Sequence, residues 1–142
     1  MLKGISPLLT PELLKIIAEM GHGDELVIGD CNFPAQSMGK RCVRADGHSG
    51  TEILDAILAL FPLDVFVETP VGLMAPTPGT FDGDPPIWKE YLPIIEKHQP
   101  GTKCEYVERF AFYDRTKEAY ATVATGEKAA YGCIILKKGV VL

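Results

Sequence analysis

The chain has 142 residues, of which 46% are hydrophobic and 23% are charged, a balance typical of one globular domain over residues 1–142. Its formal net charge of −5 argues against a nucleic-acid-binding protein, which needs a basic face. It contains no run of about 18 apolar residues and no basic amphipathic helix, so we expect no contact with a membrane.

The first predicted element is a helix. Thr10 is a suitable N-cap, and Pro11 fits the first helical position. An apolar stripe at helical spacing follows as far as Met20, and Gly21 is suited to end the helix in a left-handed conformation.

Helical and strand patterns then alternate along the chain. In chain order they predict strands at 26–28 and 42–45, a helix at 51–61, strands at 65–67 and 71–74, a loop at 77–86, a helix at 87–98, a strand at 105–107, a helix at 110–117, and strands at 120–124 and 133–136. Pro93 is expected to kink or delay its helix, and Phe110 and Phe112 are expected in the core. The alternation predicts the α/β class: a three-layer α/β/α sandwich on a mostly parallel or mixed sheet.

The four cysteines form no C-x-x-C pair, and their spacings fit no usual zinc pattern. We therefore expect free thiols, no metal site and a reducing, cytoplasmic location. The first seven residues lack the apolar core and the cleavage site of a signal peptide, which agrees with that location.

His22 lies between two glycines, where the first helix ends and the first strand begins. Glycine neighbours let a ligand come close, and imidazole is the usual general acid or base at neutral pH. We expect the ring to have no apolar neighbour. The alternative is an ordinary solvent-facing loop residue.

Asp30 and Asn32 follow the strand at 26–28, and ligands of open α/β sheets bind at the carboxyl ends of strands. Asp30 could instead only cap its own turn. Arg109 is a further candidate, whose alternative is a surface ion pair with Glu105 or Glu108.

Tyr131, Gly132 and Cys133 precede the last predicted strand. In the alternative interpretation Tyr131 packs its ring and leaves its hydroxyl in water, and Cys133 is a small buried hydrophobe. Together the loops offer an imidazole, a carboxylate, a guanidinium and a phenol, which fits a polar small ligand handled by proton transfer.

Several motifs resemble those of one family. From about residue 2 to residue 139 the chain resembles the L-fucose mutarotase branch of the ribose pyranase/fucose mutarotase (RbsD/FucU) family. The similarity is carried by the segments 9–25, 30–35, 44–47, 109–113 and 125–132. The region from Ala75 to Lys103 is the least similar.

The resemblance implies an enzyme without a cofactor that interconverts the α and β anomers of L-fucose. It places the family's proton donor on His22 and its substrate-binding aspartate and arginine on Asp30 and Arg109. The family's Tyr-Gly-Asn binding loop falls on Tyr131, Gly132 and Cys133. Cys133 thus puts a weakly hydrogen-bonding thiol where the family has an amide.

Each of these residues can be assigned a role in the reaction. Ring opening and closing requires one group to protonate the ring oxygen while another removes the anomeric hydroxyl proton. In our hypothesis His22 is the general acid, Asp30 holds sugar hydroxyls, Arg109 donates to the ring or anomeric oxygen, and Tyr131 supplies a hydroxyl contact and a ring face.

His22 and Asp30 are eight residues apart across a strand, which corresponds to roughly 26 Å of extended chain. A monosaccharide is much smaller. Either the segment bends, or the pocket combines residues from two subunits. The resemblance implies rings of ten subunits in bacteria, so we expect a homo-oligomer with its site at a subunit interface.

Three other functions are considered. A D-ribose pyranase, or a mutarotase of another monosaccharide, would keep His22 and Asp30, but Arg109 favours fucose. A non-catalytic sugar-binding or transport accessory protein would leave anomer exchange unchanged. A metal-dependent enzyme would use His22, Asp24 and Asp30.

Overall fold

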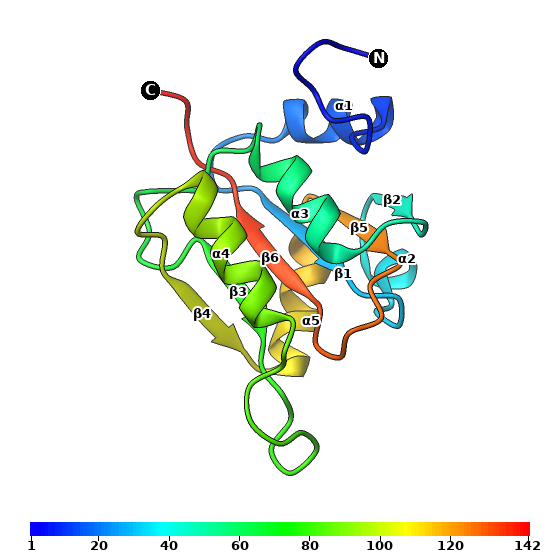
Figure 1. The fold of residues 1–142 in the computed structure, drawn as a ribbon, viewed down its shortest axis with the longest axis vertical. Helices are drawn as coiled ribbons and strands as arrows, with labels where there is room; N and C mark the ends of the chain where they lie inside the picture. The colour runs from blue at the N-terminus through cyan, green and yellow to red at the C-terminus, as the bar shows by residue number, and fades with distance from the viewer.

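The computed structural model describes residues 1–142 as six strands in one sheet and five helices (Figure 1). The helices are α1 (Pro11–Glu19), α2 (Ala35–Met38), α3 (Gly50–Leu58), α4 (Trp88–His98) and α5 (Arg109–Glu118). The strands are β1 (Glu25–Gly29), β2 (Cys42–Ala45), β3 (Val71–Met74), β4 (Cys104–Val107), β5 (Ala121–Thr125) and β6 (Ile134–Lys137). None of the helices combines the length and the apolar character needed to cross a bilayer.

The sheet has the order β2-β5-β1-β6-β3-β4 and is mixed. β6 pairs antiparallel with both β1 and β3, whereas the other neighbours pair in parallel. The start of β6 therefore meets the carboxyl ends of the other five strands at one edge of the sheet. We call this edge the carboxyl edge and the opposite one the amino edge.

Side chains that alternate along the strands point to opposite faces of the sheet and contribute to two hydrophobic cores. Leu26 and Ile28 of β1 belong to the larger core, which contains the apolar faces of α1, α3 and α4. Val27 belongs to the smaller core on the other face of the sheet, where Phe112 of α5 is fully buried. Figure 1 shows α3 and α4 in front of the sheet and α5 behind it. The prediction of a three-layer sandwich on a mixed sheet is confirmed.

The start of α1 is as predicted, but its end is not. Thr10 Oγ1 accepts the Leu13 N–H at 3.2 Å, and Pro11 follows in the first turn. Gly21 is not a left-handed stop, because the chain leaves the helix through an extended Met20. The positive φ of 87° belongs to Gly23 instead.

Two further local predictions are wrong. Residues 65–67 form bends rather than a strand, because the Asp64 carboxylate accepts the Phe66 N–H and closes a turn. Phe110 is 63% exposed, since two positions along a helix it cannot share the buried face of Phe112. Pro93 lies within α4, which already begins at Trp88, so the start of the helix is not delayed; the other alternative, a kink at Pro93, stays a prediction. The four-residue helix α2 was not predicted, because so short a segment has no readable period.

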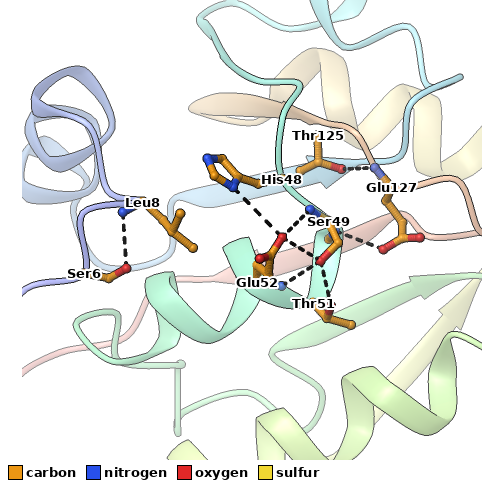
Figure 2. A network of polar contacts seen from close by, with 9 residues as sticks. Ser6, Leu8, His48, Ser49, Thr51, Glu52, Thr125 and Glu127 are labelled. Atoms are coloured by element: carbon orange, nitrogen blue, oxygen red, sulfur yellow. Dashed lines mark hydrogen bonds and ion pairs between the residues drawn. The ribbon is translucent and has the colours of Figure 1, made fainter.

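The start of α3 is fixed by two acidic side chains (Figure 2). Ser49 and Glu52 form a capping box, with bonds of 3.2 and 2.8 Å. The buried carboxylate of Glu127 accepts the N–H of Gly50 at 3.0 Å and that of Ala129 at 2.9 Å. Glu127 therefore ties the segment leading into β6 to the start of α3.

Candidate active site

A cavity of about 290 Å³ opens at the carboxyl edge of the sheet. Its walls include Asp30, Phe33, Arg109, Tyr113, Tyr131 and Cys133. Small-molecule sites have volumes of roughly 300 Å³ and more, so this cavity suits a small ligand. Four of the predicted site residues, Asp30, Arg109, Tyr131 and Cys133, thus meet at one place.

Asp30 is the first residue after β1, and both of its carboxylate oxygens have partners. Oδ1 accepts the N–H of Asn32 at 3.0 Å, which is the turn-capping role considered from the sequence. Oδ2 accepts the thiol of Cys133 at 3.3 Å. Asp30 therefore caps its turn and lines the cavity at the same time.

Cys133 is 1% exposed, so its thiol is a buried group that contacts Asp30. Burial, and then the negative charge of Asp30, raise the pKa of this thiol well above its usual value. It therefore stays protonated and donates to Asp30 at neutral pH. The interpretation of Cys133 as a buried residue is confirmed.

Arg109 begins α5 and has no acidic partner. Its Nε donates to the hydroxyl of Tyr113 at 3.0 Å. The two predicted partners are engaged elsewhere: Glu105 pairs with Arg115, and Glu108 accepts N–H groups at the start of α5. The remaining N–H groups of the Arg109 guanidinium are thus free to meet a ligand in the cavity.

Tyr131 has a left-handed backbone, with φ of 58°, the one positive φ outside glycine. Its hydroxyl accepts the N–H of Thr77 at 3.3 Å and lies 3.0 Å from the hydroxyl of Thr80, both in the predicted loop 77–86. The bond with Thr80 is the main cause that lowers the pKa of Tyr131. The phenol is therefore anchored at the cavity wall and does not lie free in water.

Gly132 is required by close packing. A Cβ at this position would lie 2.9 Å from Cγ of Glu127 and 3.1 Å from the carbonyl oxygen of Ala129. Its own carbonyl accepts the hydroxyl of Tyr91 at 2.9 Å, a fully buried contact from α4. Gly132 thus sets the backbone that carries Tyr131 and Cys133 into the cavity wall.

His22 lies at the other end of β1, at the amino edge. The next residue, Gly23, donates to the carbonyl of Lys138 just after β6. The His22 side chain is 46% exposed, and its Nε2 lies 3.0 Å from Oδ1 of the buried Asp64. Its ring packs against the ring of Phe66, with 5.6 Å between the ring centroids, so the expectation of no apolar neighbour was wrong.

The structure therefore does not bring His22 and Asp30 together within one chain. β1 pairs without interruption with β5 from Leu26 to Gly29, so the segment between the two residues does not bend. The metal set of His22, Asp24 and Asp30 is likewise not assembled, and no other group of three or more such side chains is. Asp64 had no signal in the sequence, because it is a single carboxylate 42 residues from His22.

The thiols of the native chain are expected to differ in reactivity. At pH 8, iodoacetamide should modify the exposed Cys31 at least about tenfold faster than Cys133, because only a thiolate attacks. Burial also raises the pKa of Cys104, to about 11. Mass spectrometry of native and unfolded samples measures this, and equal rates at Cys31 and Cys133 in the native chain would contradict the buried contact with Asp30.

Two kinds of comparison identify similar proteins by sequence. The model of the "RbsD / FucU transport protein family" matches residues 3–141. The L-fucose mutarotase of Actinobacillus pleuropneumoniae serotype 5b (strain L20) is 55% identical over 141 residues, which are 99% of this chain and 97% of that protein. The L-fucose mutarotase of Glaesserella parasuis serovar 5 (strain SH0165) is 52% identical, over 99% of this chain and 96% of its own.

Solved structures are similar over the whole fold. The crystal structure of the fucose mutarotase from Streptococcus pneumoniae in complex with L-fucose matches with a TM-score of 0.93 and 46% identity, over 99% of this chain and 100% of that one. FucU from Bifidobacterium longum matches with a TM-score of 0.94 and 51% identity, with the same coverage. Bacillus subtilis RbsD complexed with D-ribose has a TM-score of 0.73 at 24% identity, which is a likeness of fold alone.

Proposed function

This chain belongs to the RbsD/FucU family, and from that premise we propose that it is an L-fucose mutarotase, an isomerase that interconverts the α and β anomers of the sugar. The observation that carries the proposal is the 55% identity, over 99% of the chain, to a protein of that name. The cavity at the carboxyl edge supplies the polar groups that a monosaccharide requires.

Mutarotation needs only the movement of protons. A general acid protonates the ring oxygen while a base removes the proton of the anomeric hydroxyl, and the C1–O bond to the ring opens. Rotation about C1–C2 followed by the reverse transfers closes the ring on the other face. One well-placed acid–base group accelerates such a step by roughly 10²–10⁴-fold.

In this proposal the cavity binds the sugar and His22 moves the proton. The carboxylate of Asp30 accepts sugar hydroxyls, and the free N–H groups of Arg109 donate to the ring or anomeric oxygen. Tyr131 offers its ring face and its hydroxyl at the wall. Cys133 acts on the sugar through Asp30, because its thiol already donates to that carboxylate.

We further propose that each site forms between two subunits of a homo-oligomer, the ring of ten that the family resemblance implies. The support is the placement of His22 and the cavity at opposite edges of one sheet. Large apolar side chains are exposed at both places: Val65 and Phe66 near His22, and Phe110 beside Arg109. Subunit contact would bury these side chains and bring His22 of one subunit to the cavity of the next.

We also propose that the protein is cytoplasmic and that it acts in carbohydrate metabolism. The four cysteines are free thiols, which suits a reducing compartment.

Saturation-transfer NMR between the α and β anomeric protons tests the activity. With L-fucose, D-ribose and D-galactose in parallel samples, we expect faster exchange for L-fucose. Exchange of D-ribose between pyranose and furanose forms would assign the chain to the pyranase branch instead. Line broadening without faster exchange would indicate a non-catalytic sugar-binding protein, and no effect on any of the sugars would contradict the proposal.

A further inference from the structure

Asp64 is a buried carboxylate that contacts a half-exposed imidazole. It is 3% exposed, and its Oδ1 lies 3.0 Å from Nε2 of His22. Buried charges are uncommon unless they are paired and hydrogen-bonded. The contact therefore needs an explanation beyond chance proximity on a surface.

The backbone around Asp64 is fixed from two sides. The N–H of Asp64 donates to the carbonyl of Lys137 in β6 at 3.1 Å. The side-chain amide of Gln99 holds the preceding residue, Leu63, through bonds of 2.9 Å to its N–H and 3.1 Å to its carbonyl. The carboxylate thus sits on a rigid part of the sheet edge, although the loop that follows it has no regular structure.

The carboxylate stays ionised at neutral pH. Its Oδ1 also accepts the N–H of Phe66 at 3.0 Å, and this bond is the main cause that lowers the pKa of Asp64. The hydrogen bond from His22 lowers it further. An ionised carboxylate accepts hydrogen bonds and donates none, so the proton between the two groups belongs to Nε2 of His22.

We propose that Asp64 is a positioning residue that holds His22 in the Nε2–H tautomer, so that Nδ1 is the atom that accepts a proton from the sugar and, once the ring is an imidazolium, returns it as the general acid. The inference rests on the proposed mutarotase function and specifies which atom of His22 acts. Phe66 also restricts the orientation of the imidazole, because its ring packs against it with 5.6 Å between the ring centroids. With Nε2 bonded to Asp64 and the Phe66 ring packed beside the imidazole, the ring presents Nδ1 in a fixed direction.

Asp64→Leu tests the proposal, because leucine is similar in size and has no hydrogen-bond acceptor. Nε2 of His22 then loses the partner that fixes its hydrogen, so the ring can exchange between its two tautomers. We expect kcat for L-fucose anomer exchange to fall about 10- to 100-fold, the order expected of a misplaced catalytic group. KM should stay close to that of the unaltered protein, because the cavity at the carboxyl edge is untouched.

Nitrogen-15 NMR of the imidazole measures the tautomer of His22, which would not change if Asp64 only stabilised the fold. In the unaltered protein, above the pH at which the ring is protonated, we expect Nε2 to carry the hydrogen. In Asp64→Leu we expect nitrogen-15 shifts averaged between the two tautomers. This measurement needs no sugar, so it decides the role of Asp64 even if the proposed activity fails.

Asp55→Leu is the matched control. Asp55 Oδ1 lies 2.6 Å from Nε2 of His98, in a second histidine–aspartate pair between α3 and α4 that includes neither His22 nor a residue lining the cavity. This substitution should leave both kcat and the His22 tautomer unchanged. An Nδ1–H tautomer in the unaltered protein would overturn the proposal without any variant, and so would an unchanged kcat in a folded Asp64→Leu protein.

Discussion

Replacing His22 with glutamine is expected to slow L-fucose anomer exchange by about 10²–10⁴-fold, the share that one acid–base group contributes. Glutamine cannot titrate, but its NH₂ group can still donate to Asp64, so the buried carboxylate keeps a partner. Binding of L-fucose should persist, because the residues that line the cavity are unchanged. Saturation-transfer NMR gives the rate, and sugar titration gives the affinity.

His48→Gln is the matched control for this loss. His48 also follows a glycine and has a comparable exposure, 42% against 46% for His22. Its acidic neighbour is Glu52, at 4.0 Å, in the cap of α3. We expect full activity in this variant, and full activity in His22→Gln would contradict the assignment of His22 as the acid.

The periodic elements of the fold could be predicted because burial decides them locally. Leu26, Val27 and Ile28 read as a strand buried on both faces, and Thr10 with Pro11 marked the start of a helix. The direction of β6 could not be read, because an apolar run looks the same in a parallel and an antiparallel pairing. Residues 65–67 were misjudged for a related reason: their composition favours a strand, but the N–H of Phe66 donates to the Asp64 carboxylate and the chain turns instead.

The cavity was easier to predict than its surroundings. Asp30 and Cys133 are 103 residues apart, yet both stood in motifs that the family resemblance singled out, and the structure joins them. Asp64 and Glu127 are buried carboxylates whose partners, His22 and Gly50, lie 42 and 77 residues away. Such pairs depend on tertiary packing, and a single sequence holds no spacing that reveals them.

Two variants that are each inactive are expected to restore activity when they assemble together. His22→Gln lacks the acid and Asp30→Asn lacks the carboxylate, so each alone should lose most of its exchange rate. If a site takes His22 from one subunit and Asp30 from the next, equal and random co-assembly leaves both residues intact in about a quarter of the sites. Co-expression with two different tags, purification on both tags, and saturation-transfer NMR measure this fraction.

The unaltered chain co-assembled with the double variant, His22→Gln with Asp30→Asn, supplies the matched comparison. For a site between subunits, this mixture also has about a quarter of its sites intact, so the two mixtures should be equally active. For a site within one subunit, about half of the sites would be intact in the mixture that contains the double variant. No site would be intact in the mixture of the two single variants. Because β1 runs without a break between His22 and Asp30, we expect the two mixtures to be equally active. Half of the full activity in the double-variant mixture and none in the mixture of single variants would contradict a site between subunits.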